Sequence, residues 1–205
     1  MFIFAIGVPA ESSNIIPELE DLNIVFLQDL VREEYPDREF APNSRDPHIW
    51  LSIKRVKVMV DEIANELARI DPDNSDYYLT NASLYNDSLD ELDDDIENIF
   101  IGKTMRKFIV FHPSYGYFAD DYNLEMYALE EDGKEATASH LQDMIDLAND
   151  YNINYVFHQA EIDSTQVIAF VEEIDGETVQ LNPLGYDYLQ NMLNMGELIG
   201  ASLHE

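Results

Sequence analysis

The spacing of apolar residues changes along the chain, and its first part predicts only two short strands. Residues 2–8 (FIFAIGV) and 23–28 (NIVFLQ) are apolar runs with the length of short buried strands. The stretch between them predicts a loop and a short helix. Residues 29–50 are polar and interrupted by prolines, which predicts a further loop.

Two long helices are predicted next, over residues 52–70 and 75–99, with DPDN at 71–74 ending the first. In both, apolar residues recur at alternating steps of three and four, which places them on one helix face. These residues are Ile53, Val56, Val60, Ile63, Leu67 and Ile70, then Tyr78, Ala82, Tyr85, Leu89, Leu92, Ile96 and Ile99. The run DELDDDIEN on the second helix could hold cations loosely, but a solvated face is the simpler interpretation.

From Lys107 onward, predicted strands and helices alternate. The strands are 107–111, 124–130, 153–159 and 176–182, and the helices are 115–122, 137–150, 164–174 and 185–203. This alternation predicts the α/β class, with a mainly parallel four-stranded sheet. Ligands of such sheets bind beyond the carboxyl ends of the strands.

Composition narrows the range of partners. Among 205 residues, 42 Asp and Glu stand against 11 Lys and Arg, for a formal net charge of -31. This excess argues against nucleic acid and anionic membranes, which require clustered basic residues. It favours cations or simply a well-solvated surface. There are no cysteines, so a transition-metal site would have to use His, Asp and Glu.

Histidines at element boundaries are the candidate metal ligands. His48 lies between a proline and Trp50, the only tryptophan, just before the first long helix, and we expect Trp50 to pack against it. His112 follows an apolar strand and precedes a proline and a Tyr-Gly-Tyr turn. His158 and Asn182 follow two further predicted strands.

A structural interpretation stands beside each of these. A lone histidine at a strand end is more often a hydrogen-bonded structural residue, and Asn182 with its proline could form a turn only. Residues 46–50 could be a helix-entry turn with a hydrophobic plug. His140 is expected to face solvent from a helix, and His204 lies in the terminal tail.

Several motifs together resemble the zinc/manganese substrate-binding proteins of ABC importers. They are DPHIWLS, FHPSYGYFADDYNLE and LNPLGYDYL, supported by IGVPAES and ARIDPDNSDYYLTNASLYNDSLDELDDDI. The resemblance runs over nearly the whole chain in the expected order. It implies two α/β lobes, the first incomplete, joined by a long rigid helix, with metal bound in the cleft between the lobes. The implied division is 1–74 for a partial first lobe, 75–102 for the linking helix and 103–205 for the second lobe.

The resemblance also implies a ligand set. The histidine of the family's DPHxW motif matches His48, and that of its FHxxxGYF motif matches His112. The acid that usually supplies the fourth ligand falls on Asn182, a weak zinc ligand. His158, Tyr115 and Tyr117 are expected near the site.

Three departures from the family pattern shape the expectation. The resemblance implies that the family's N-terminal third, with its first histidine ligand, is missing from this chain, and we find no signal peptide or lipobox motif in the sequence. Asn182 replaces an acid. The loop before DPHxW, rich in histidine in many members, is represented here by DREFAPNSR. The resemblance still implies an extracytoplasmic location.

The leading hypothesis is capture of a divalent transition metal, zinc before manganese, for delivery to an ABC membrane permease. The alternative is a truncated or degenerate scaffold that acts as an interaction module, with homo-oligomers formed through the incomplete first lobe. A metal hydrolase is a third reading. Glu161 and Asp163 follow His158, but no HExxH pairing is present, so we expect no enzymatic activity.

Overall fold

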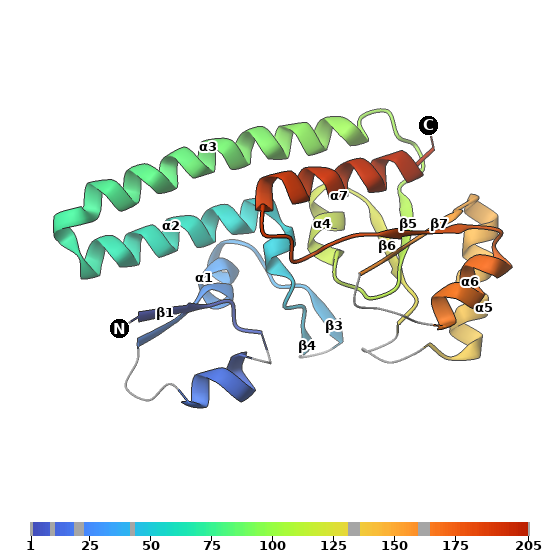
Figure 1. Ribbon diagram of the computed structural model, residues 1–205, viewed down its shortest axis with the longest axis horizontal. Coiled ribbons are helices and arrows are strands. Elements are labelled where there is room, and N and C mark those ends of the chain that lie inside the picture. Colours follow the sequence, from blue (N-terminus) through green and yellow to red (C-terminus); the bar gives the residue numbers. More distant parts are fainter. Residues whose placement is uncertain are drawn as a thin grey trace. The chain divides into compact units, whose positions relative to one another are not determined.

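The computed structural model describes residues 2–8, 11–18, 23–41, 44–130, 136–159 and 165–204 (Figure 1). The chain divides into two compact units, Met1–Glu91 and Leu92–Glu205. The boundary falls within the long helix α3 (Ser75–Phe100). The three-part division expected from the sequence stays a prediction. In the ranges that the structure describes, every helix is too short or too polar to cross a membrane.

The first unit begins with two parallel strands, β1 (Phe2–Ala5) and β2 (Asn23–Phe26), which confirms both predicted strands. Two short helical turns, Glu11–Ile15 and Ile16–Glu18, lie between them. The Glu11 carboxylate accepts hydrogen bonds from the backbone nitrogens of Gly7 and Val8, at 2.6 and 3.0 Å. It thereby closes the turn that follows β1, where Gly7 has a φ of 105°.

The predicted loop over residues 29–50 is wrong. Helix α1 (Leu27–Glu34) begins directly after β2, and β3 (Glu39–Ala41) pairs antiparallel with β4 (Ser44–Arg45). Leu27 and Val31 are buried, and the helix packs against α2. With so few apolar residues, the helical period was masked by the exposed acidic positions around them.

The two predicted long helices are confirmed as α2 (Ile53–Ile70) and α3. Ser52 caps α2 by accepting a hydrogen bond from the Arg55 backbone nitrogen at 3.4 Å. The buried face of α2 is wider than expected. Ile53 and Val56 are buried as predicted, Met59 and Ala64 are buried on either side of that face, and only Ile70 at its end is exposed. An open apolar groove of about 310 Å³ lies between the two helices; it is lined by Val60, Ile63, Ala64, Leu67, Tyr78, Asn81, Ala82 and Tyr85.

The second unit holds the predicted four-stranded sheet, and all its pairings are parallel (Figure 1). The strand order is β6-β5-β7-β8. The strands are β5 (Lys107–Val110), β6 (Glu125–Ala128), β7 (Tyr155–His158) and β8 (Glu177–Gln180). The helices are α4 (Gly116–Asp121), α5 (Ala138–Tyr151), α6 (Thr165–Glu173) and α7 (Tyr188–Ser202). The α/β class and the element order predicted from residue 107 onward are therefore confirmed.

The register between β5 and β6 brings together residues that differ by 18 in number. Lys107 lies opposite Glu125, and their side chains form an ion pair. The ladder continues past the strands, because the Glu130 backbone nitrogen donates to the Phe111 oxygen at 2.9 Å. The same offset therefore brings residue 130 beside residue 112 at the carboxyl end of the pair.

Helix α7 packs closely on the last turns of α3 through two glycines. A Cβ at Gly200 would lie 2.3 Å from the Cγ2 of Ile99, whereas a Cβ at Gly196 would lie 3.3 Å from Ile96. The Lys103 Nζ also donates to the Leu203 oxygen at 3.0 Å. Close approach of these two helices therefore depends on the missing side chain at Gly200.

We expect Gly200→Ala to lower the free energy of unfolding by about 1–3 kcal/mol, because the Ile99 Cγ2 is attached next to the backbone and cannot move aside. Gly196→Ala is the matched control. Its milder crowding is offset by about 1 kcal/mol of helix propensity. Urea denaturation of both variants tests this, and equal transition midpoints would contradict the packing described here.

Candidate functional site

His48 lies in the first unit shortly before the N-terminus of α2, where a carboxylate and two aromatic rings contact it. The Asp46 Oδ1 lies 2.7 Å from the His48 Nδ1 and also accepts from the His48 backbone nitrogen at 2.9 Å. The ring centroids of Trp50 and Phe40 lie 5.3 and 6.0 Å from that of His48, both edge-on. The expected packing of Trp50 against His48 is confirmed.

Asp46 is itself fixed from several sides. It is 1% exposed. Its Oδ2 lies 3.8 Å from the Arg38 Nε, and its backbone nitrogen donates to the Arg38 oxygen at 2.8 Å. The buried Gln28 side chain donates to the Asp46 backbone oxygen at 2.9 Å. The carboxylate facing the His48 ring is therefore a rigid part of the unit.

His112 lies in the second unit, directly after β5 and Phe111. Its Nδ1 lies 2.5 Å from the Glu130 Oε2, and the two side chains are 30% and 16% exposed. The register of β5 and β6 explains this pairing. Glu130 was not among the predicted site residues, although it is the last residue of the predicted strand 124–130 and lies where parallel sheets bind ligands.

The residues expected near the site lie in different surroundings. The His158 Nδ1 lies 3.0 Å from the oxygen of the next residue, Gln159. Gln159 in turn donates to the buried Ser114 hydroxyl at 2.6 Å, which ties the ends of β5 and β7 together. Tyr115 and Tyr117 are buried in the core beside the His112 segment.

Asn182 forms a side-chain turn at the end of β8. Its Oδ1 accepts from the Leu184 backbone nitrogen at 3.1 Å, and its backbone oxygen accepts from the Asn191 side chain at 2.7 Å. Because β7 lies between β5 and β8, the backbones at the two strand ends are about 10 Å apart. These bonds match the turn interpretation, and a ligand role for Asn182 stays a prediction.

The remaining histidines contact backbone oxygens. The expectation that His140 faces solvent is wrong, because its half-buried ring places Nε2 2.9 Å from the Ala128 oxygen, where α5 lies beside the end of β6. The His204 Nε2 lies 3.2 Å from the Asn152 oxygen. Glu161 and Asp163 lie outside the described residues.

In each unit, one histidine singled out by its sequence motif lies against a carboxylate. Within the ranges that the structure describes, no group of three or more His, Asp or Glu side chains is arranged to hold a metal ion. The pairs Asp46–His48 and Glu130–His112 have the same chemistry, with a carboxylate at Nδ1. In metal sites such a contact orients a histidine that binds through its other nitrogen.

Comparison with known proteins gives this arrangement its context. The family model described as "Zinc-uptake complex component A periplasmic" matches residues 3–201. The chain belongs to this family, the ZnuA family. It is 28% identical over 168 residues to the high-affinity zinc uptake system protein ZnuA of Paracoccus denitrificans, with 77% of this chain and 52% of that protein covered. The chain spans about half the length of the curated relatives it matches.

Solved structures agree in fold. A crystal structure of ZnuA superposes with a TM-score of 0.89 at 32% identity, over 97% of this chain and 78% of the other. The periplasmic zinc-binding protein TroA of Treponema pallidum, at 18% identity, has a TM-score of 0.86 and covers all of this chain and 81% of its own. At that identity the likeness concerns the fold alone.

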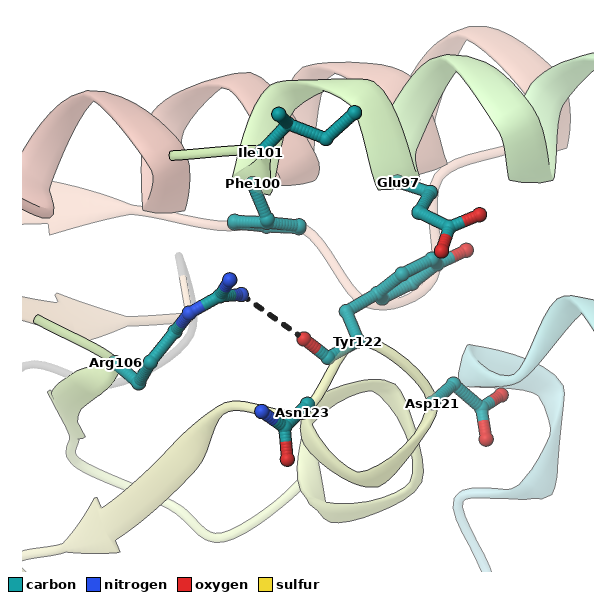
Figure 2. A pocket seen from close by; sticks show the side chains of 7 residues that line it. All are labelled: Glu97, Phe100, Ile101, Arg106, Asp121, Tyr122 and Asn123. Atoms are coloured by element: carbon teal, nitrogen blue, oxygen red, sulfur yellow. Dashed lines mark hydrogen bonds between the residues drawn. The ribbon is translucent and has the colours of Figure 1, made fainter. Parts of the chain in front are cut away.

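A pocket of about 190 Å³ in this ZnuA-family chain is lined by residues that include Arg106, Tyr122 and Asn123, but not His112 (Figure 2). Arg106 precedes β5 and Asn123 precedes β6, so the pocket lies at the amino ends of the strands. Figure 2 shows the Arg106 guanidinium donating to the backbone oxygen of Tyr122, a contact of 3.3 Å. The Arg106 Nε also donates to the backbone oxygen of Lys103 at 3.0 Å. We therefore assign Arg106 a structural role, because it joins the segment after α3 to the end of α4.

Tyr122, in the same pocket, gives a test at alkaline pH. Burial raises the pKa of its phenol, and so does the hydrogen bond that it donates to the Asp93 Oδ1 at 2.6 Å. Because the pKa of the phenol is higher in the folded chain than in the unfolded chain, Tyr122 contributes its full stabilisation below about pH 10. This contribution declines as the pH rises above the pKa of the unfolded chain.

We expect Tyr122→Phe to cost about 1 kcal/mol at neutral pH and to weaken the loss of stability above about pH 10. Tyr186→Phe is the control, because Tyr186 is fully exposed. Urea denaturation at neutral and alkaline pH measures both effects. A Tyr122→Phe protein that loses stability with pH as steeply as the wild type would contradict the assignment.

Proposed function

We propose that this chain binds a divalent transition metal ion, zinc before manganese, and passes it to the membrane permease of an ABC importer. It acts as a receptor and not as an enzyme. His48 and His112, one from each unit, would bind the ion in a cleft between the lobes. Asn182 or water would complete the coordination.

The observation that supports this role most strongly is the shared environment of the two histidines. Each is the histidine of a motif that resembles one of the family's, and each has a carboxylate oxygen within hydrogen-bond distance of Nδ1. Imidazole nitrogen suits zinc better than the harder manganese ion. The Paracoccus relative is described as a zinc uptake protein, and a ZnuA structure at 31% identity is described as zinc-bound.

The family description and the charge of the chain suggest the setting. The description places the family in the periplasm, where a receptor would meet ions before they reach the permease. The formal net charge of -31 would raise the local concentration of cations around the protein. It would give no preference among metals, so selectivity has to come from the two imidazoles.

Isothermal titration with Zn²⁺ tests the proposal. We expect His48→Ala and His112→Ala each to weaken zinc binding by more than about 100-fold, since losing even an outer partner of a ligand costs about 10–100-fold. His204→Ala is the matched control, because this exposed histidine lies in the C-terminal tail with its Nε2 3.2 Å from the Asn152 backbone oxygen. Zinc binding that is unchanged in the double variant would refute the site, and competition with Mn²⁺ tests the preference.

A second candidate is an interaction module that has kept the receptor fold without tight metal binding. In the described part of the first unit, β1 and β2 pair only with each other. A two-stranded sheet presents backbone groups that can pair with another chain.

If this candidate function is correct, sedimentation velocity should show a dimer whose fraction increases with protein concentration. Its stability should not depend on zinc. A single monomeric species across the concentration range would contradict it, as would tight zinc binding by the monomer.

A further inference from the structure

Two carboxylates face the two histidines of the family motifs at the same ring atom. The Asp46 Oδ1 lies 2.7 Å from the Nδ1 of His48, and the Glu130 Oε2 lies 2.5 Å from the Nδ1 of His112. His140 and His204 differ, because each places Nε2 against a backbone oxygen. The carboxylate contacts thus coincide with the histidines that sequence resemblance marks as ligands.

The chemistry of imidazole makes this contact directional. A neutral ring carries a proton on one nitrogen and a lone pair on the other. A carboxylate only accepts hydrogen bonds, so it favours the tautomer with hydrogen on Nδ1. The lone pair is then on Nε2, the atom through which a metal would be bound.

We propose that Asp46 and Glu130 are positioning residues that assign Nε2 of His48 and His112 as the metal-binding atoms. The inference rests on the proposed function. Neither carboxylate acts on the metal directly. Each selects the tautomer of one ring and fixes its orientation before the ion arrives.

Both carboxylates are held by the folded backbone, which is what a positioning role requires. Asp46 is buried and bonded through its backbone to Arg38 and Gln28. Glu130 is aligned by its backbone hydrogen bond to Phe111, which extends the ladder of β5 and β6. Rotating either ring would require breaking a contact that the fold itself maintains.

Ring-nitrogen NMR of the metal-free protein, at mildly alkaline pH, tests the tautomer. We expect hydrogen on Nδ1 of His48 and His112 in the wild type. Glu130→Ala should shift His112 toward a mixture of tautomers, whereas Glu130→Gln keeps an acceptor oxygen and should restore the wild-type signal. Asp46→Asn is the corresponding conservative change at His48, chosen because Asp46 is buried.

Zinc titration of the same proteins gives the second measurement. We expect Glu130→Ala to lower zinc affinity by about 10–100-fold and Glu130→Gln to recover part of it. Glu125→Ala is the matched control, because it removes an ion pair made by the same register at the other end of the two strands. It should leave zinc affinity and the His112 tautomer unchanged.

The outcomes separate this inference from the proposed function. Zinc binding through both histidines, combined with hydrogen on Nε2 or with full affinity in Glu130→Ala, would overturn the positioning role alone. A wild type that does not bind zinc would overturn both, whatever its tautomers. Equal losses of affinity in Glu125→Ala and Glu130→Ala would show a purely structural effect and overturn the positioning role.

Discussion

Parallel pairing of β5 with β6 determines which side chains meet at both ends of these two strands. At the amino end it joins Lys107 to Glu125. The hydrogen bond that Lys107 donates to Glu125 raises the pKa of Lys107 and lowers the pKa of Glu125. The Tyr127 hydroxyl, which accepts from Lys107 and donates to Glu125, adds to both shifts. At the carboxyl end the same offset joins His112 to Glu130. A slip of one residue would separate both pairs, so the candidate site depends on backbone hydrogen bonds made well away from it.

Much of the fold could be predicted because long elements have clear periods. The alternating steps of three and four in residues 75–99 gave α3 almost to the residue, and the repeated strand and helix pattern after Lys107 gave the parallel sheet. Helix α1 was missed because eight residues hold too few apolar positions to show a period. The buried face of α2 was predicted too narrow, because tertiary packing, which single-chain periodicity does not record, also buries Met59 and Ala64 at its flanks.

The candidate site could be predicted only in part, and the missing part is contact information. His48 and His112 stand out in the sequence because prolines and aromatics flank them at element boundaries. The Glu130 partner of His112 is 18 residues away and becomes visible only once the strand register is known. Asn182 was weighed as a ligand or a turn, and its side-chain bond to the Leu184 backbone could not be read from the letters alone.

The packing of α7 on the last turns of α3 also bears on how the polypeptide is made. The Leu203 oxygen bonds Lys103 across 100 residues, and Gly200 contacts Ile99. While a nascent chain is still short of Gly200, the apolar Ile96 and Ile99 lack the helix that covers them. The core of the second unit is therefore complete only once Gly200 has been synthesised and α7 has packed on α3.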